Sequence, residues 1–426
     1  LGVDVFAALT SGDGNVAVGF KSLTGTTTGS NNTAVGDGAG YRITTGADNT
    51  VIGNMEDSGV GAMTSSSNTF VGRSAGESNT SGASNTFIGS LCGDLATTGA
   101  TNTGVGGSCL TALTTAANNT AVGASSMAAN TTGTDNVAMG SGALTANTTG
   151  AAHTAVGRSA LGANTTGNDN TAVGLNSLIA NTTGNQNTAI GVAALASNTT
   201  ATDNTAVGYI ALYGNTTGTL NTAVGVGSLR TNTTGNYNTA VGRNALYANT
   251  TANSNTAVGL DSLASNTTGT ENTAVGTDAL VANTTGNFST AVGTSALAAQ
   301  TGAGENTAVG RGSQIATTSG TGNTSIGEGS GRDITTGSQN VMVGADAGRA
   351  ASPSGSITTE SNRLCMGNNT ITNAYIKVAW TVTSDKRDKT DIEPLTMGLN
   401  FVNKLEPVTY KWDMRSDYKD GKPDGT

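Results

Sequence analysis

The sequence predicts an all-β protein, a parallel β-solenoid (β-roll) of about 20 coils followed by the start of an α+β domain. Three observations support this prediction: NTAVG or a near variant recurs with a 17-residue period, 62 glycines accompany only 11 % charged residues, and charge rises abruptly near the C-terminus. The charged fraction lies far below the roughly 25 % of ordinary domains. Val, Ile and Thr are plentiful, which is unlike a disordered chain and favours a repetitive β structure.

The motif glycine sets the period of the predicted coils. It falls at Gly19, Gly36 and Gly53 and then from Gly72 to Gly344, always one 17-residue period apart except for a 19-residue step between Gly53 and Gly72. A continuous helix is excluded because NTTG at a fixed phase would break it in every period. One short strand with turns in each period, stacked about 4.8 Å apart, gives a shaft of roughly 95 Å.

The chemistry at each position of the period predicts which side chains face inward. The residue before the glycine is aliphatic or Met in all 20 coils, and the residue three after it is Ala, Ser or Cys in every coil except that of Glu56. We therefore expect a narrow interior in which each coil buries only Val, Ala and Leu. The residue four before the glycine is Asn in 18 coils, which predicts a ladder of side-chain amides that bind turn backbone groups. His153 and Ser289 take this slot in the other two coils, so His153 is interpreted as a ladder member and not as a metal ligand or base.

The cysteines show no CxxC spacing and predict no metal site. Cys92 and Cys109 each fall three residues after a motif glycine, one coil apart, and are interpreted as small core residues. A stacking distance near 4.8 Å also lies within the Cα range of a disulfide, so that pairing stays open. Cys365 is expected in the core of a degenerate final coil. The recurrent NTT matches the glycosylation sequon, but its fixed phase favours a role in the turn.

A core this thin favours packing against other copies of the chain, and we expect a homotrimer. The NTAVG strand with its small-residue segment resembles the left-handed β-roll of trimeric autotransporter adhesin heads and the repetitive shafts of phage tail fibres. Coils of the adhesin heads are shorter than the period found in this chain.

The C-terminal segment differs in composition from the repeats. Residues 384–426 hold 17 of the chain's 47 charged residues and three of its four prolines. The pattern SDKRDKTDIEPL…GLNFVNKLEPVTYKWD resembles the opening of the intramolecular chaperone and self-cleaving peptidase domain of endosialidase-type tail spikes and fibres. The matching residues are Ser384, Asp385, Arg387, Lys389, Ile392, Leu395, Leu405, Pro407, Val408, Tyr410 and Trp412.

This resemblance implies a site for self-cleavage. In that family the domain trimerises, promotes folding of the fibre ahead of it and then cuts itself off before the serine of its SD motif. Carried over, the scissile bond joins Thr383 to Ser384, with Ser384 as nucleophile and Lys389 as general base; Asp385 and Arg387 would support them. A lysine acts as a base only if burial or a neighbouring cation lowers its pKa. A solvated turn with incidental charges is the alternative interpretation of these residues.

The domain boundaries follow from these patterns. We expect a fragment edge at 1–14, the repeat shaft at 15–348 and a degenerate coil and neck at 349–383. The N-terminal part of the chaperone domain, shorter than its usual length, is expected at 384–426. Tyr375 and Trp380 lie in a β-prone run of the neck, where we expect burial and not sugar binding.

The predicted function is structural: a trimeric fibre of a phage tail, located in the virion, whose one enzymatic step is the cut in its own chain. Its expected partners are other copies of itself, other tail proteins and a host receptor or glycan. No cofactor and no metal are predicted. The net charge of −9 argues against binding to nucleic acid. The sequence contains no apolar run of about 18 residues, so no transmembrane helix is predicted. The main alternative is a trimeric adhesin on a bacterial cell surface. A third is a surface- or ice-binding solenoid using the second Thr of NTTG.

Overall fold

The computed structural model describes residues 2–55 and 59–375. Predictions that fall on residues 376–426 lie outside this part of the chain. Each strand in it has three residues, and the strands are β1 (Val16–Val18), β2 (Thr33–Val35), β3 (Thr50–Ile52), β4 (Thr69–Val71), β5 (Thr86–Ile88), β6 (Thr103–Val105), β7 (Thr120–Val122), β8 (Val137–Met139), β9 (Thr154–Val156), β10 (Thr171–Val173), β11 (Thr188–Ile190), β12 (Thr205–Val207), β13 (Thr222–Val224), β14 (Thr239–Val241), β15 (Thr256–Val258), β16 (Thr273–Val275), β17 (Thr290–Val292), β18 (Thr307–Val309), β19 (Thr324–Ile326), β20 (Val341–Val343) and β21 (Leu364–Met366).

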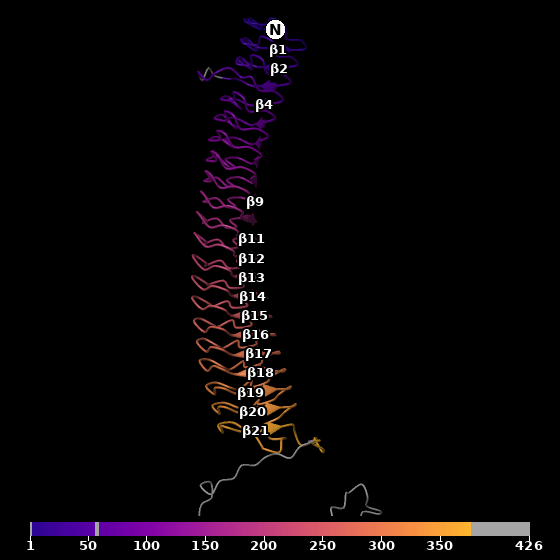
Figure 1. Ribbon diagram of the computed structural model, residues 1–426, viewed down its shortest axis with the longest axis vertical. Coiled ribbons are helices and arrows are strands. Elements are labelled where there is room, and N and C mark those ends of the chain that lie inside the picture. Colours follow the sequence, from indigo (N-terminus) through magenta and orange to yellow (C-terminus); the bar gives the residue numbers. More distant parts are fainter. Residues whose placement is uncertain (1, 56–58, 376–426) are drawn as a thin grey trace, which may run out of the picture. The chain divides into compact units, whose positions relative to one another are not determined.

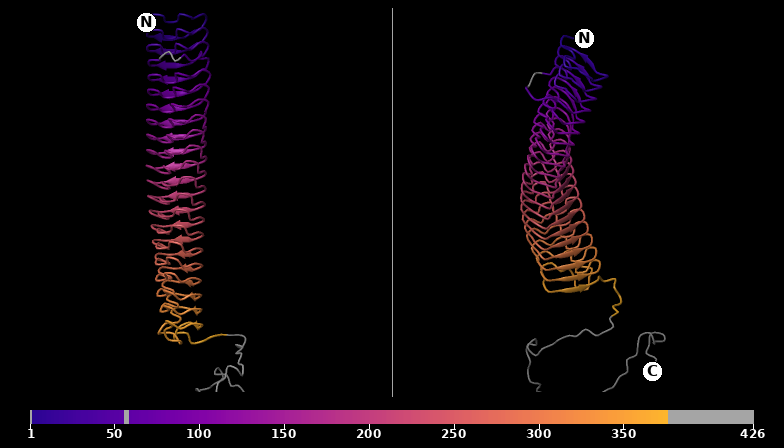
Figure 2. Two further views of the ribbon diagram at one scale, coloured as in Figure 1. Left: turned by 90° about the vertical axis from the view of Figure 1, so that its left-hand side faces the viewer. Right: turned by 45° about the horizontal axis from the view of Figure 1, so that its top comes forward.

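The strands form one parallel sheet in which each strand pairs with the next one along the chain. Equivalent residues stand opposite each other, as in the pair of Ala172 with Ala189 between β10 and β11. Figure 1 shows one strand per coil stacked along the long axis, and Figure 2 shows that the stack bends gently. The prediction of a parallel β-solenoid with a 17-residue period is therefore confirmed.

The glycine after each strand is required by the distance between coils. A Cβ added at Gly174 would lie 2.5 Å from the carbonyl oxygen of Gly191 in the next coil, closer than any real contact of this kind. Its φ of +134° also lies in a region that residues with side chains avoid. The leucine four residues later keeps a left-handed backbone although it is bulky, with φ of +51° at Leu178.

The interior of each coil is built mainly from two small residues and one leucine. In the coil of β10 these are Ala172, Ser177 and Leu178, all fully buried. The prediction of a small inward residue three after the glycine is confirmed along the shaft. The expected burial of the valine at the end of each strand is wrong, because Val173 and its equivalents point out of the coil and are half-buried or exposed. In a three-residue strand the middle side chain faces one way and the outer two face the other.

Where the middle strand residue is large, the usual leucine is replaced by glycine. Phe70 and Phe87 stack with their ring centroids 5.5 Å apart, and the leucine positions of their coils hold Gly76 and Gly93. A Cβ at Gly93 would lie 2.6 Å from Cε2 of Phe87, and one at Gly76 would meet the ring of Phe70 at the same distance. In these two coils the glycine makes room for the phenylalanine ring, as close packing of the interior requires.

Two ladders of asparagine side chains run through the turns. In the predicted ladder Asn187 donates its backbone N–H to Oδ1 of Asn170 (3.0 Å) and its Nδ2 to the carbonyl of Ala201 (2.8 Å). The second ladder is formed by the Asn of NTTG. Nδ2 of Asn181 donates to Oδ1 of Asn164 in the preceding coil at 2.8 Å and to the carbonyl of Gly184 in its own turn at 3.0 Å. These asparagines are fully buried, which confirms that NTT serves the turn. The second Thr of the motif, such as Thr183, is exposed.

Cys92 and Cys109 are buried in the core and joined by a disulfide between adjacent coils, with 4.7 Å between their Cα atoms. The sequence favoured two separate core residues, and the pairing that was left open is the one found. Gly104, which takes the place of the usual inward alanine in β6, accommodates the bridge. A Cβ there would lie 2.5 Å from Sγ of Cys92.

Non-repeating residues occupy both ends of the solenoid. Residues 2–14 continue the stack, and Lys21 donates its backbone N–H to the carbonyl of Val3. At the other end the last coil is longer, and a cluster of Ile334, Met342, Ala347, Ile357 and Cys365 fills its interior, as predicted for Cys365. Tyr375 is 95 % exposed, so its expected burial is wrong, and Trp380 lies outside the described residues.

Candidate functional site

The residues predicted to cleave the chain lie outside the described residues. They are Thr383, Ser384, Asp385, Arg387 and Lys389, and the described chain ends eight residues before the first of them. Their roles stay predictions. The surfaces of the shaft are described, and two of them bear on function.

The first surface is the outward face of the sheet. Each three-residue strand directs its first and third side chains outward, and these are Thr and Val in most coils. The third residue is exposed in many strands, for example by 44 % at Val18, 41 % at Ile190 and 46 % at Ile326. Because the strands stack in register, the side chains of the third strand residues form one continuous aliphatic ladder. We call it the valine ladder.

The valine ladder is large for the surface of a single chain. With roughly 60 Å² exposed by each of about 20 side chains, it presents on the order of 1,200 Å² of apolar surface, whereas patches on monomers are usually a few hundred Å². A stable interface needs about 1,000 Å² or more. The ladder therefore has the size and the chemistry of a contact surface.

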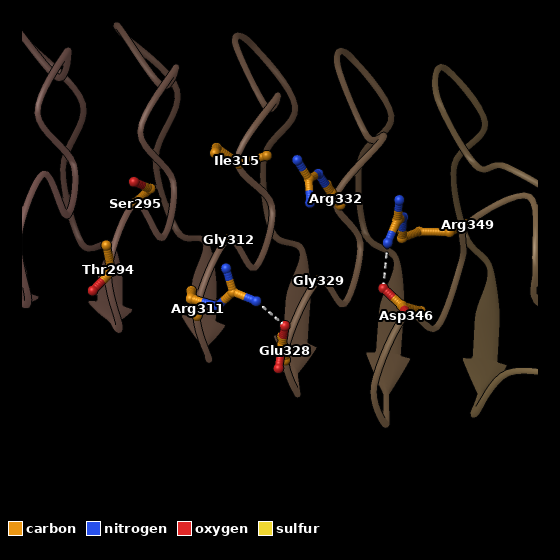
Figure 3. A pocket seen from close by; sticks show the side chains of 10 residues that line it. All are labelled: Thr294, Ser295, Arg311, Gly312, Ile315, Glu328, Gly329, Arg332, Asp346 and Arg349. Atoms are coloured by element: carbon orange, nitrogen blue, oxygen red, sulfur yellow. Dashed lines mark hydrogen bonds and ion pairs between the residues drawn. The ribbon is translucent and has the colours of Figure 1, made fainter.

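The second surface is a charged groove of about 240 Å³ near the C-terminal end of the solenoid, in which successive coils each place a charged side chain (Figure 3). Arg311 pairs with Glu328 in the next coil, and both are largely exposed. Arg349 pairs with Asp346, and this hydrogen bond raises the pKa of Arg349 above its ordinary value. Exposed pairs of this kind contribute little to stability. The groove is lined by three arginines, two carboxylates and the hydroxyls of Thr294 and Ser295.

His153 is buried in the asparagine ladder, as predicted. Its Nδ1 accepts the backbone N–H of Asn170 at 3.2 Å, and its Nε2 lies 2.6 Å from the carbonyl oxygen of Gly167. The neutral imidazole with its proton on Nε2 satisfies both partners. Burial lowers the pKa of His153, so the ring stays neutral in the ladder.

No group of three or more His, Cys, Asp or Glu side chains in residues 2–55 and 59–375 could hold a metal ion. The same residues contain no helix long and apolar enough to span a bilayer.

Comparison with known proteins addresses the segment that follows the solenoid. No curated protein matches the chain. Residues 384–425 match the Peptidase S74 family model, described as chaperone of endosialidase. The match begins at Ser384, the residue at which the charge of the chain rises. The chain thus carries a β-solenoid, and residues 384–425 after it match a chaperone domain of the endosialidase type.

Proposed function

We propose that the chain is a trimeric fibre of a phage tail or a related host-adsorption apparatus, and that its C-terminal chaperone cuts itself off between Thr383 and Ser384. The observation that carries the proposal is the chaperone match over residues 384–425, which follows a long solenoid in the sequence. Intramolecular chaperones of this type are typical of phage tail fibres and spikes. A removable folding aid suits a shaft whose strands must all stack in one register.

The valine ladder supports the trimeric assembly. Its side chains repeat once per coil along the whole sheet, so a partner that covers all of them needs the same repeat. Another copy of this chain meets that condition. Burying the ladder between copies would add the apolar core that a coil of Ala, Ser and Leu does not supply alone.

The proposed cleavage uses residues of the matched segment. Lys389, with its amine neutral, takes the proton from Oγ of Ser384, and Oγ attacks the carbonyl carbon of Thr383. An ester forms as the peptide bond breaks, and the proton passes to the amino group of Ser384. Water then hydrolyses the ester and leaves a carboxylate on Thr383. The completed shaft would persist because its unfolding is slow.

Intact-mass analysis of the full natural reading frame tests the cut. We expect loss of a C-terminal piece that begins at Ser384, and no cut in Ser384→Ala or Lys389→Ala. Ser416→Ala and Lys404→Ala are matched controls from the same segment and should still be cut. A cut at another bond, or one that survives Ser384→Ala in trimers of normal mass, would contradict the proposed chemistry.

Sedimentation of the same samples tests the assembly. Three chains per particle, in the wild type and in the uncut variants, is the expected result. A stable monomer would overturn the fibre proposal.

A further inference from the structure

Three large apolar side chains stand on one exposed edge of the solenoid. In each coil the residue immediately before the ladder asparagine lies at the tip of a turn, and we call these residues the outer turn column. In the described chain they are polar or small in nearly every coil, as at Asp169 and Gln186. The exceptions are Leu220, Tyr237 and Phe288, which are 46 %, 62 % and 55 % exposed.

Stability of the coil does not account for these three residues. Their φ angles are +58°, +57° and +58° at Leu220, Tyr237 and Phe288, in the left-handed region. That region favours Gly, Asn and Asp and disfavours bulky side chains. Their exposure also means that the coil gains little burial in return. An aromatic residue at such a position is therefore better explained by a ligand than by packing.

Each of the two aromatic residues borders a hollow with polar walls. The hollow at Tyr237 measures about 350 Å³ and is lined by Asn236, Tyr237, Asn253, Ser254, Thr270 and Glu271. The hollow at Phe288 measures about 230 Å³, and its other lining residues are Asn287, Gly302, Gly304, Glu305 and Thr321. Both hollows combine an aromatic ring with an amide, a hydroxyl and a carboxylate, and neither is lined by Lys or Arg.

Hydrogen bonds between coils fix the orientation of the amides. Oδ1 of Asn253 accepts the backbone N–H of Asn236, and Oδ1 of Asn287 accepts the backbone N–H of Thr270, each at 2.7 Å. The amide oxygens are therefore occupied, and the Nδ2 groups are the ends left to donate to a ligand. Glu271 and Glu305 supply acceptors beside them.

We propose that the outer turn column between Leu220 and Phe288 binds a linear carbohydrate. A sugar ring has an apolar face that packs on an aromatic ring and hydroxyls that pair with amides and carboxylates, and ligand sites commonly combine such groups. Tyr237 and Phe288 are three coils apart, roughly 14 Å, so one ligand reaching both is an oligosaccharide. The carboxylates, with no cation in either hollow, select a neutral or amino sugar over an acidic one. The inference rests on the proposed host-contacting function.

A printed array of neutral, N-acetylated, amino and sialylated oligosaccharides tests this inference with the full-length fibre. We expect the wild-type fibre to bind neutral or amino sugars. The double variant Tyr237→Asn/Phe288→Asn should bind them about tenfold more weakly or worse, and tenfold corresponds to a loss of about 1.4 kcal/mol of binding free energy. Asn suits the left-handed backbone at both positions, so the variant should fold at least as well. Tyr209→Asn is the matched control, because Tyr209 is 55 % exposed elsewhere on the coil.

The outcomes separate this inference from the proposed function. A fibre that cleaves and trimerises but binds no sugar on the array overturns the carbohydrate site alone. Preference for sialylated sugars, or equal binding by the double variant, also overturns it. If the double variant loses its trimers, the column is a contact between copies and the inference is wrong. An uncut monomer that still binds neutral sugars supports the site and overturns the fibre proposal.

Discussion

Phe87 and Gly93 share one interior volume, and exchanging them for the usual pair should show strong energetic coupling. Phe87 is fully buried, so Phe87→Ala should lower the free energy of unfolding by about 3–5 kcal/mol. Gly93→Leu places a side chain into the ring of Phe87, since its Cβ alone would lie 2.6 Å from Cε2. Overpacking of this kind costs about 1–3 kcal/mol, and a further ~1 kcal/mol arises from a leucine at positive φ.

The double variant recreates the interior of an ordinary coil. Ala and Leu then stand where Ala172 and Leu178 stand in the coil of β10, with the leucine at φ of +51°. The ring stack with Phe70 is still lost, at about 0.5–1.5 kcal/mol. We expect a total loss of about 2–3 kcal/mol, whereas the two single losses sum to about 5–9 kcal/mol, so the coupling energy between the two substitutions is at least about 2 kcal/mol.

Hydrogen exchange measures this coupling locally, which matters because solenoids open coil by coil. The opening free energy of the amides in β5 should fall most in the two single variants and recover in the double variant. Phe87→Ala with Gly348→Leu is the matched control, because Gly348 packs against Met342 in a distant coil. That control should be additive. Additive losses in Phe87→Ala/Gly93→Leu would refute the shared-volume reasoning.

Three further predictions follow from the described residues. His153→Asn should remove a pH dependence: in the wild type the lowered pKa means that stability falls as pH drops below about 6.5, since the unfolded chain takes up the proton first. Urea unfolding at about pH 7.5 and about pH 5 checks this, and His153 is the chain's one histidine, so an equal loss in the variant would contradict it. Reduction of the disulfide, or Cys92→Ser/Cys109→Ser, should lower the free energy of unfolding by about 3 kcal/mol, because the bond restricts the unfolded chain by closing a loop with a sequence separation of 17; denaturant titration with and without reductant would show this. Val207→Lys with Val224→Lys should dissociate the proposed trimer in sedimentation, whereas Thr183→Lys, on an exposed turn, should not.

The period made most of the coil predictable from sequence. A position with the same chemistry in every coil has the same environment in every coil, so the small inward residue and the asparagine ladder could be identified before the structure was known. The same reasoning gave the place of His153. It failed for the valine, because a three-residue strand can direct an aliphatic side chain either way, and hydrophobicity alone favours the inside. Ala172 and Leu178 fill the interior of this coil, and alternation along the strand then directs Val173 outward.

Features confined to one or two coils were harder to predict. The exchange of leucine for glycine opposite Phe70 and Phe87 becomes intelligible once both positions are known to face the same interior. Gly104 is explained by the disulfide beside it, which the sequence left open. The proposed self-cleaving site rests on family resemblance alone, because Ser384 and Lys389 lie outside the repeats and their proposed roles cannot be read from the 17-residue period.

The distribution of these irregular features explains why a uniform shaft would need a clamp. The longer step between Gly53 and Gly72, the phenylalanine pair and the disulfide all lie before Met127, and the long last coil lies after Gly344. The coils between them present almost the same ladder at every step. In the proposed trimer, a copy displaced by one coil would lose about one twentieth of the valine ladder contacts and keep the rest, so many slipped registers would be nearly as stable as the correct one. Such states are traps for a long parallel assembly. A domain that aligns the three C-terminal ends would exclude all of these slipped registers at once. It could then be cut away, because the stacked shaft would unfold slowly.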